Sequence, residues 1–524
     1  MNDFKKCLPA ISIILCFFVF AVFILPFFPI DETRYLTVAW EMKLRHSFLV
    51  PFLNGAPYSH KPPFLFWMVN LLWGIIGVNE FVPRLVPLVF SILSVIMTFK
   101  IASFLFEDDE KTAEASIFIL VSSFLWLIWS VLFMFDIILT FFSLFAVYQF
   151  LRAVKSGRYS LPFFLAGISM GIGIIVKGPV IFVHTLPVAI LIPFLYQEAD
   201  KRRWFAMFVL SIVAAAITGL AWAGPAAISG GKAYAEAILW GQTANRVVSS
   251  FAHRRAFWWY LSLLPIIFFP WGLNLGMWKS FFSPVRSDGH KGKKLLVFWF
   301  LSCLFIFSLI SGKQIHYLIP ELPCFAMLFA SEIKNYSNFK KNNMAVVFFV
   351  LGVVLFILPI FYLGSDIGYM PKSDLFLLSF VSFCLSVLIF FKGCTSERFL
   401  FFSSLSSLIF LIIFLFSSTG FLKRYDLTDL ASFVKNKEEK GMIVVHYGKY
   451  AGQYTFAGRL EKKVEVLENA DELRQFVLKH NNFILVQFTK KKIMDKGIIF
   501  SHLYRNRHAI VWDRQGVINN LSDF

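Results

Sequence analysis

The chain has 524 residues, of which 58% are hydrophobic and only 16% are charged, and its mean hydropathy is +0.68. This is more apolar surface than one water-soluble core can bury, so a soluble globular protein is excluded. The formal net charge of +18 does not indicate nucleic-acid binding, because much of the lysine and arginine lies in short loops between apolar runs. Six cysteines in or beside these runs give no support for a disulfide framework.

Thirteen apolar runs have the length and composition of membrane-spanning helices. They cover residues 7–29, 80–104, 113–130, 134–151, 161–176, 179–196, 204–223, 257–277, 294–311, 316–332, 344–364, 374–391 and 399–419. A further apolar stretch, Pro63 to Gly77, is shorter and follows Lys61, so we expect a helix that lies in the outer interface. The sequence therefore predicts a polytopic α-helical membrane protein.

Loop charges predict the orientation of these helices. With the N-terminus in the cytoplasm, the inner loops contain clusters such as residues 201–203, whereas the short outer loops hold only Lys177, Lys313 and Lys372. This distribution follows the positive-inside rule. Because the number of spans is odd, we expect the C-terminus on the outer side.

The composition becomes polar after about Leu422. Strand-like segments at 442–447 and 483–488 alternate with helical segments at 426–435 and 471–480. We therefore expect a transmembrane domain at residues 1–420, with outer loops at 30–79 and 224–256, and a small extracytoplasmic α/β domain at 421–524. The small domain contains no phosphate-binding loop, Rossmann glycine pattern or zinc-finger spacing, so we assign it no chemistry.

Charged residues follow the first apolar run directly, in the segment Asp31-Glu32-Thr33-Arg34-Tyr35. Ordinary helix capping explains such charges, because Asp and Glu favour a first helical turn. A functional site is the alternative, because charges at membrane depth are costly unless they are paired or line a wet cavity. The second interpretation is favoured because other charges are predicted on the same side: His60, Lys61, Asp136, Lys177 and Lys313.

Each member of this set also has a structural interpretation. Asp136 and Lys177 would join two helices if they form an ion pair. Lys61 and Lys313 would reach lipid headgroups if their side chains extend along the membrane surface. His60 and His253 lack a short metal-ligand spacing and are typical of hydrogen-bonded interfacial histidines. The argument for a site therefore depends on the whole set.

The order of these motifs resembles that of the bacterial lipid A aminoarabinose transferases, which belong with the protein O-mannosyltransferases among the C-type glycosyltransferases (family 39). The resemblance covers residues 10–330 by motif and the whole chain by architecture. It includes Asp31-Glu32-x-Arg34-Tyr35, Lys61-Pro62-Pro63, Asp136, Lys177-Gly178-Pro179, the stretch from His253 to Trp271, and the stretch from Lys313 to Pro323.

The resemblance implies transfer of a sugar from a polyprenyl (undecaprenyl) phosphate carrier to lipid A or another lipopolysaccharide acceptor at the periplasmic face of the bacterial inner membrane. It implies that Asp31 and Asp136 are the essential acids and that Lys61 binds the donor phosphate. We expect Glu32, beside Asp31, to be catalytic as well. We expect substrate binding also to involve Arg34, Tyr35, Lys177, Arg246, Lys313, His316 and Tyr317.

A metal is an open question within this resemblance. In the aminoarabinose branch a glutamate before the phosphate-binding lysine and a histidine in the long outer loop hold zinc. The matching positions here are His60 and His253, so the first departs from the pattern. No cofactor is required by the chemistry. The expected partners are the lipid-linked donor, the acceptor and membrane lipids, without nucleic acid, and we expect a monomer.

Two other functions are compatible with parts of the sequence. A lipid transporter or flippase would also carry intramembrane charges, but near the midplane and together with repeated broken helices, which are not evident. A glycosyltransferase that acts on protein hydroxyls or on another envelope glycan would keep the donor chemistry and change only the acceptor. The sequence does not separate these acceptors.

Overall fold

The computed structural model describes residues 2–107, 109–241, 254–274, 278, 291–333, 342–361, 366–367, 370–392, 396–490, 497–521 and 524. The chain forms two compact units. The helical unit comprises Met1–Phe23, Ser59–Leu65 and Asn79–Ser417. The sheet unit comprises Ile24–Tyr58, Phe66–Val78 and Ser418–Phe524.

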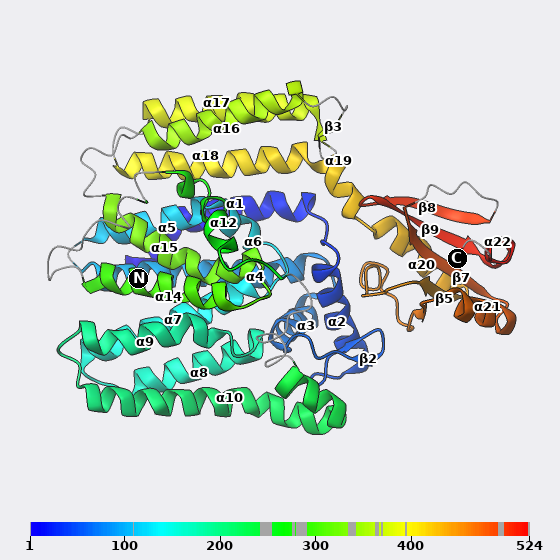
Figure 1. Ribbon diagram of the computed structural model, residues 1–524, viewed down its shortest axis with the longest axis horizontal. Helices are drawn as coiled ribbons and strands as arrows, with labels where there is room; N and C mark the ends of the chain where they lie inside the picture. Colours follow the sequence, from blue (N-terminus) through cyan, green and yellow to red (C-terminus); the bar gives the residue numbers. More distant parts are fainter. Residues whose placement is uncertain are drawn as a thin grey trace. The chain divides into compact units, whose positions relative to one another are not determined.

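Long apolar helices lie side by side in the helical unit (Figure 1). Within the described ranges, nine helices are long and apolar enough to cross a membrane. They are α1 (Asn2–Ile24), α4 (Phe81–Leu105), α7 (Asp136–Ser156), α8 (Ser160–Lys177), α10 (Lys201–Glu236), α14 (Lys291–Leu309), α16 (Asn342–Phe361), α17 (Lys372–Lys392) and α18 (Ser396–Ser417). The protein is a multi-pass membrane protein, and the predicted polytopic helical fold is confirmed.

Four of the predicted spans contain shorter or interrupted helices. They hold α5 (Glu110–Ser122) with α6 (Phe124–Trp129), α9 (Ile181–Leu195), α12 (Trp259–Ile267) with the 3₁₀ turn η2 (Trp271–Leu273), and the 3₁₀ segment η4 (Ile315–Glu321) with α15 (Leu322–Ile333). The backbone of Ser123 is extended, which separates α5 from α6. Pro320 interrupts the regular hydrogen bonding of η4, because proline has no N–H to donate.

Glycines allow α8 and α10 to approach each other closely. A Cβ atom added at Gly171 would lie 2.3 Å from Cβ of Thr218, and one added at Gly167 would lie 2.6 Å from the carbonyl oxygen of Ser211. Helix association inside membranes depends on such close backbone packing of small residues. The interface between α8 and α10 therefore has no room for larger side chains at these two positions.

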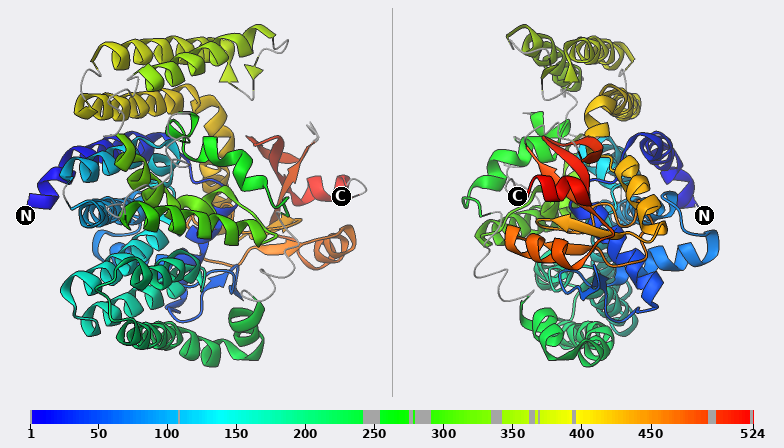
Figure 2. Two further views of the ribbon diagram at one scale, coloured as in Figure 1. Left: turned by 60° about the vertical axis from the view of Figure 1, so that its left-hand side comes forward. Right: turned by 90° about the vertical axis from the view of Figure 1, so that its right-hand side faces the viewer.

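A five-stranded sheet forms the C-terminal part of the sheet unit (Figure 2). Its strands are β5 (Ile443–Tyr447), β6 (Glu465–Leu467), β7 (Phe483–Thr489), β8 (Ile498–Tyr504) and β9 (Arg507–Asp513), in the order β6-β5-β7-β9-β8. Strands β6, β5 and β7 are parallel, and β9 is antiparallel to both β7 and β8. The predicted α/β fold of this region is confirmed, including both predicted strands.

Alternating residues of the strands bury the two faces of the sheet against different helices. Val444 packs with residues of α20 (Thr428–Glu439), whereas its neighbour Val445 packs with residues of α21 (Ala470–Lys479) and α22 (Arg514–Asn519). The two-residue side-chain period of a strand causes this alternation. The helices predicted at 426–435 and 471–480 are confirmed as α20 and α21.

The sheet unit also contains most of the first predicted outer loop, whereas Ser59–Leu65 belongs to the helical unit. This loop folds as α2 (Asp31–Arg45), a hairpin of β1 (Phe52–Leu53) and β2 (Ala56–Pro57), and α3 (Phe64–Ile76), most of which belongs to this unit. The 13 residues of α3 are too few to cross a bilayer of about 30 Å as a helix. The division into domains at residue 420 stays a prediction, since the compact unit joins this loop to the C-terminal region.

Short elements complete the described chain: η1 (Ala237–Gly241), β3 (Asp366–Ile367), β4 (Met370–Pro371), α19 (Thr419–Leu422) and η5 (Lys423–Tyr425).

We expect Gly171→Leu to destabilise the helical unit, because the new side chain overlaps with Thr218. Overpacking of this kind typically costs about 1–3 kcal/mol. The measurement is the thermal midpoint of the purified protein in detergent. Gly224→Leu in α10 is the matched control, because a Cβ atom there meets nothing within 4 Å. Equal midpoints for the two variants would contradict the close packing of α8 and α10.

Candidate active site

A buried ion pair joins α7 and α8. Lys177, the last residue of α8, donates from Nζ to Oδ1 of Asp136, the first residue of α7, at 2.5 Å. The two side chains are only 9% and 1% exposed. Nζ of Lys177 also lies 5.0 Å from the ring centre of Tyr317 in η4. Each charge lies at the helix end where the helix dipole favours it. Three of the predicted site residues are therefore neighbours.

Two further predicted residues lie around Asp136. Nζ of Lys61 is 5.6 Å from the ring centre of Phe135, and the imidazole of His316 stacks on Trp129 with 6.3 Å between ring centres. Both Lys61 and His316 are close enough to Asp136 to interact with its charge. The structure thus groups two lysines and a histidine around one carboxylate.

Lys313 is placed differently from these residues. Its Nζ donates to the backbone carbonyl of Ile310 at 2.6 Å and to that of Arg255 at 3.3 Å. The side chain is buried, and this burial lowers the pKa of the ammonium group. The position favours a structural role, in which Lys313 joins the end of α14 to the segment at Arg255. Its predicted role in substrate binding stays a prediction.

A second group of predicted residues lies on the first turn of α2, in the sheet unit. Arg34 forms an ion pair with Asp31, and the hydroxyl of Tyr35 lies 3.4 Å from Oδ1 of Asp31. The Asp31 side chain is 47% exposed, whereas Nε of Arg34 is buried and has no hydrogen-bond partner. Burial, together with the nearby charge of Asp31, raises the pKa of Tyr35 well above its usual value. Tyr35 therefore stays a hydrogen-bond donor at neutral pH, beside an accessible carboxylate.

Glu32 has a different environment from its neighbour Asp31. Its side chain is buried, and Oε2 accepts a hydrogen bond from the backbone N–H of Phe28 at 2.9 Å. The residue before α2 is Ile30, whose side chain cannot cap the helix. Glu32 therefore supplies the polar contact at the helix start. Of the two adjacent acids, Asp31 is the accessible one, and a catalytic role for Glu32 stays a prediction.

The C-terminal region of the sheet unit holds α2 through backbone carbonyls. The hydroxyl of Thr37 donates to the carbonyl of Gly452 at 2.8 Å, and Nε1 of Trp40 donates to that of Leu460 at 2.8 Å. Gly452 has a φ of +76°, and a Cβ atom there would lie 2.7 Å from the Thr37 side chain. Glycine is thus required twice at this position, for its backbone conformation and for its contact with α2.

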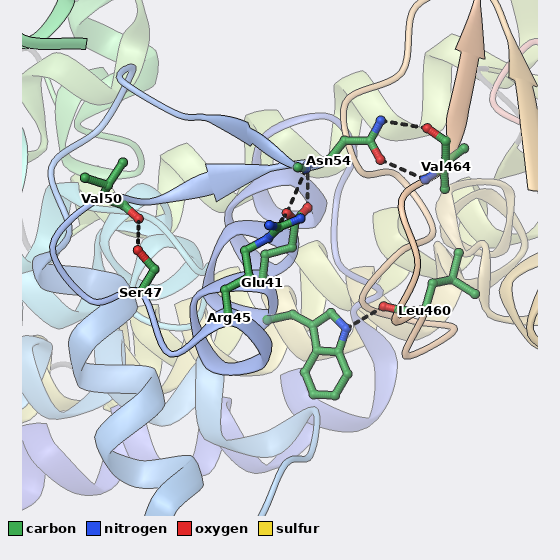
Figure 3. Close-up of polar contacts among 9 residues, drawn as sticks. Glu41, Arg45, Ser47, Val50, Asn54, Leu460 and Val464 are labelled. Atoms are coloured by element: carbon green, nitrogen blue, oxygen red, sulfur yellow. Dashed lines mark hydrogen bonds and ion pairs between the residues drawn. The ribbon is translucent and has the colours of Figure 1, made fainter. Parts of the chain in front are cut away.

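The β1–β2 hairpin adds a second connection to the same region (Figure 3). Its turn residues Asn54 and Gly55 have φ values of 51° and 78°, as Asn-Gly hairpin turns require. Glu41 of α2 accepts hydrogen bonds from both backbone N–H groups. The Asn54 amide donates to the carbonyl of Val464 at 2.9 Å and accepts from its N–H at 3.0 Å. Helix α2 is therefore tied through the hairpin to the segment before β6.

Two of the predicted residues lie outside the described ranges. Three residues that form contacts in the structure were not predicted from the sequence. Arg246 and His253 fall on residues 242–253, which the structure does not describe. His60 is described and exposed, so the metal site predicted at His60 and His253 stays a prediction. Thr37, Trp40 and Asn54 were not predicted. Only the Asn54-Gly55 turn had a recognisable signal, which is the usual sequence of a tight hairpin.

Known proteins with similar sequences and folds support the resemblance. Residues 60–227 match the family of dolichyl-phosphate-mannose-protein mannosyltransferases. A curated relative from Pseudomonas aeruginosa strain UCBPP-PA14, an undecaprenyl phosphate-alpha-4-amino-4-deoxy-L-arabinose arabinosyl transferase, is 29% identical over 307 residues, which are 57% of this chain and 54% of the relative. A second such transferase, from Proteus mirabilis, is 25% identical over 68% of this chain and 65% of its own.

The crystal structure of ArnT from Cupriavidus metallidurans bound to undecaprenyl phosphate superposes with a TM-score of 0.78. The match covers 96% of this chain and 97% of ArnT at 14% sequence identity. The chain has the fold of ArnT. The resemblance to the aminoarabinose transferases and the protein mannosyltransferases is therefore confirmed. By sequence, the chain spans about half the length of the first curated relatives that it matches.

We expect Lys177→Met to destabilise the protein, because it leaves the buried Asp136 carboxylate without its cation. Breaking a buried pair on one side costs about 3–5 kcal/mol. The double variant Asp136→Leu with Lys177→Met removes both charges and should recover most of the thermal midpoint. The midpoint of each variant in detergent is the measurement. A single variant as stable as the wild type would contradict the pairing.

We expect Asn54→Gly to loosen the connection between the hairpin and the segment at Val464. Glycine keeps the positive φ of the turn and removes both side-chain hydrogen bonds, which contribute about 0.5–1.5 kcal/mol each. The measurement is hydrogen–deuterium exchange, which should become faster at residues 460–467 and stay unchanged in α7 and α8. Asn469→Gly is a control, because it removes an N-cap at another helix. Unchanged exchange at Val464 would contradict the connection.

Proposed function

We propose that this protein is a membrane glycosyltransferase that moves a sugar from a polyprenyl-phosphate carrier to lipid A at the periplasmic face of the bacterial inner membrane. The observation that carries the proposal is the group of Lys61, Lys177 and His316 around Asp136 in a bundle of apolar helices. Such a bundle suits a long lipid donor, and its cations suit the phosphate of that donor. The names of the relatives support this donor class.

The reaction breaks the bond between the anomeric carbon of the sugar and the phosphate oxygen. The electron pair leaves with the lipid phosphate, and the acceptor oxygen forms the new bond to the anomeric carbon. Lys61 is the cation that stabilises the leaving phosphate in this proposal, because fixed charges in a site shielded from water stabilise a developing charge without reorganisation. Lys177 is already paired with Asp136, so it acts mainly by holding that carboxylate.

In this proposal, Asp31 acts on the acceptor or on the sugar. Its carboxylate is half-exposed, and Arg34 and Tyr35 fix its position on α2. If the acceptor is a hydroxyl, Asp31 takes its proton as general base. If the acceptor is a phosphate of lipid A, the attacking oxygen is already anionic, and Asp31 orients the acceptor or binds a cationic amino group on the sugar.

A protein acceptor is the second candidate. The match of residues 60–227 to the protein mannosyltransferases favours it. The donor chemistry is the same in both cases, and only the molecule that receives the sugar differs. A test must therefore offer both acceptors to the same protein and donor.

We expect purified protein in lipid vesicles, supplied with an undecaprenyl-phosphate-linked aminoarabinose and lipid A, to increase the mass of lipid A by one sugar residue. Asp31→Asn should bind the donor normally and lower single-turnover transfer by about 10²–10⁴, the contribution of a general base or an orienting acid. Mass spectrometry follows the product, and a filter assay follows donor binding.

Asp429→Asn is the matched control, because Asp429 is an exposed acid in the first turn of another helix, α20. Transfer by this control should equal that of the wild type. If the activity of Asp31→Asn falls only as much as the amount of folded protein falls, Asp31 has a structural role. Sugar on an added hydroxyl-rich peptide in place of lipid A would favour the protein acceptor, and no transfer to either would refute the proposed function.

A further inference from the structure

Three metal-binding side chains meet inside the helical unit, away from the predicted His60 and His253 position. They are His184 of α9, Cys303 of α14 and Glu321 at the end of η4. One ligand atom from each lies within 4.8 Å of the others, and all three side chains are buried. Nδ1 of His184 lies 2.7 Å from Oε1 of Glu321. Among the described residues, this is the one group of three or more His, Cys, Asp or Glu side chains with such spacing.

Glu321 has an unsatisfied oxygen at this position. Its side chain is 0% exposed, Oε1 contacts His184, and Oε2 has no hydrogen-bond partner. Buried polar atoms are almost always satisfied, and a carboxylate oxygen without a donor is costly away from water. A missing ligand is one of the recognised reasons for such an exception. The open oxygen lies beside the imidazole of His184 and the thiol of Cys303, so a metal ion shared by the three side chains would satisfy it.

We propose that His184, Cys303 and Glu321 bind a divalent transition metal, with zinc as the best match. Thiolate, imidazole and carboxylate are the three ligand types that zinc uses in proteins. The thiolate argues against magnesium and calcium, which prefer oxygen ligands. Zinc with one thiolate, one carboxylate and a neutral imidazole has no net charge, so the complex is compatible with burial among apolar helices.

Binding requires a small rearrangement of the side chains. Two ligands on one tetrahedral zinc, at bonds of about 2.0 Å, lie about 3.3 Å apart. The hydrogen bond between His184 and Glu321 is shorter than this, so it must open slightly, or Oε2 must become the ligand. Cys303 now donates from Sγ to the carbonyl of Val183 at 3.2 Å and would lose that proton to the solvent on binding. Three protein ligands leave one tetrahedral position for a water molecule.

The metal would fix the segment that carries part of the candidate active site. Glu321 ends the 3₁₀ segment η4, which also contains His316 and Tyr317. A metal bound by Glu321, His184 and Cys303 would link this segment to both α9 and α14. In this proposal the metal positions η4 relative to α9 and α14, and this role is independent of which sugar or acceptor the protein uses.

The test measures metal in the full-length protein, purified in detergent without chelators. We expect about one zinc per chain by elemental analysis, and we expect Cys303→Ser and Glu321→Gln to lose it. Cys7→Ser is the matched control, because Cys7 is also a buried cysteine but lies in α1, outside the cluster. This control should keep the metal.

Exchange of zinc for cobalt gives a second reading on the wild-type protein, which does not depend on the folding of any variant. Cobalt bound by Cys303 should show the near-ultraviolet charge-transfer absorption of a cobalt–thiolate bond. Absence of bound zinc together with no cobalt–thiolate band would overturn the proposal. Zinc that persists in Cys303→Ser and Glu321→Gln but disappears in His60→Ala would also overturn it, and would place the metal at the exposed histidine.

Discussion

The need to neutralise charges inside an apolar bundle joins two pairs of helices in the helical unit. A charge in this environment is costly unless another element supplies its partner. Lys177 of α8 meets Asp136 of α7, and Lys293 of α14 meets Glu332 of α15 at 2.5 Å. Each pair fixes the relative position of two helices, which apolar contacts alone would leave free to slide or rotate. The ion pair that neutralises Asp136 also places Lys177 beside Tyr317. The same contact therefore joins the two helices and brings polar side chains of the candidate site together.

Hydropathy predicted where helices lie in this chain, but not where they are interrupted. The nine long helices match apolar runs that the sequence identified. The run at 316–332 was also predicted as a span, yet it begins as the 3₁₀ segment η4, whose Pro320 prevents regular helical hydrogen bonding. The chain thereby presents His316 and Tyr317 on an irregular turn, near the ends of α7 and α8. The sheet hairpin of β8 and β9 was also missed, although its strands contain the apolar runs Ile498-Ile499-Phe500 and Ala509-Ile510-Val511-Trp512.

The sequence predicted which residues belong to the candidate site better than it predicted the role of each residue. Asp136 and Lys177 were expected as possible partners from their placement at the ends of adjacent spans, and the structure pairs them. Glu32 and Lys313 looked equivalent to Asp31 and Lys61 in the sequence, but their polar atoms are engaged with backbone groups. Backbone contacts of this kind leave no sequence signature. The same holds for His184, Cys303 and Glu321, whose separation in the chain matches no short ligand motif.

The C-terminal region had no assigned chemistry, and the structure gives it a positional part in the sheet unit. Trp40 and Asn54 bond to backbone atoms more than 400 residues away in the chain. These bonds hold α2, whose first turn carries Asp31, Arg34 and Tyr35. A residue that orients a substrate must be held to within a fraction of an ångström, because small misplacements are costly in rate. In the proposed function, the position of Asp31 therefore depends on the C-terminal region, and a change in its loop at Gly452 or Leu460 reaches the acid through α2.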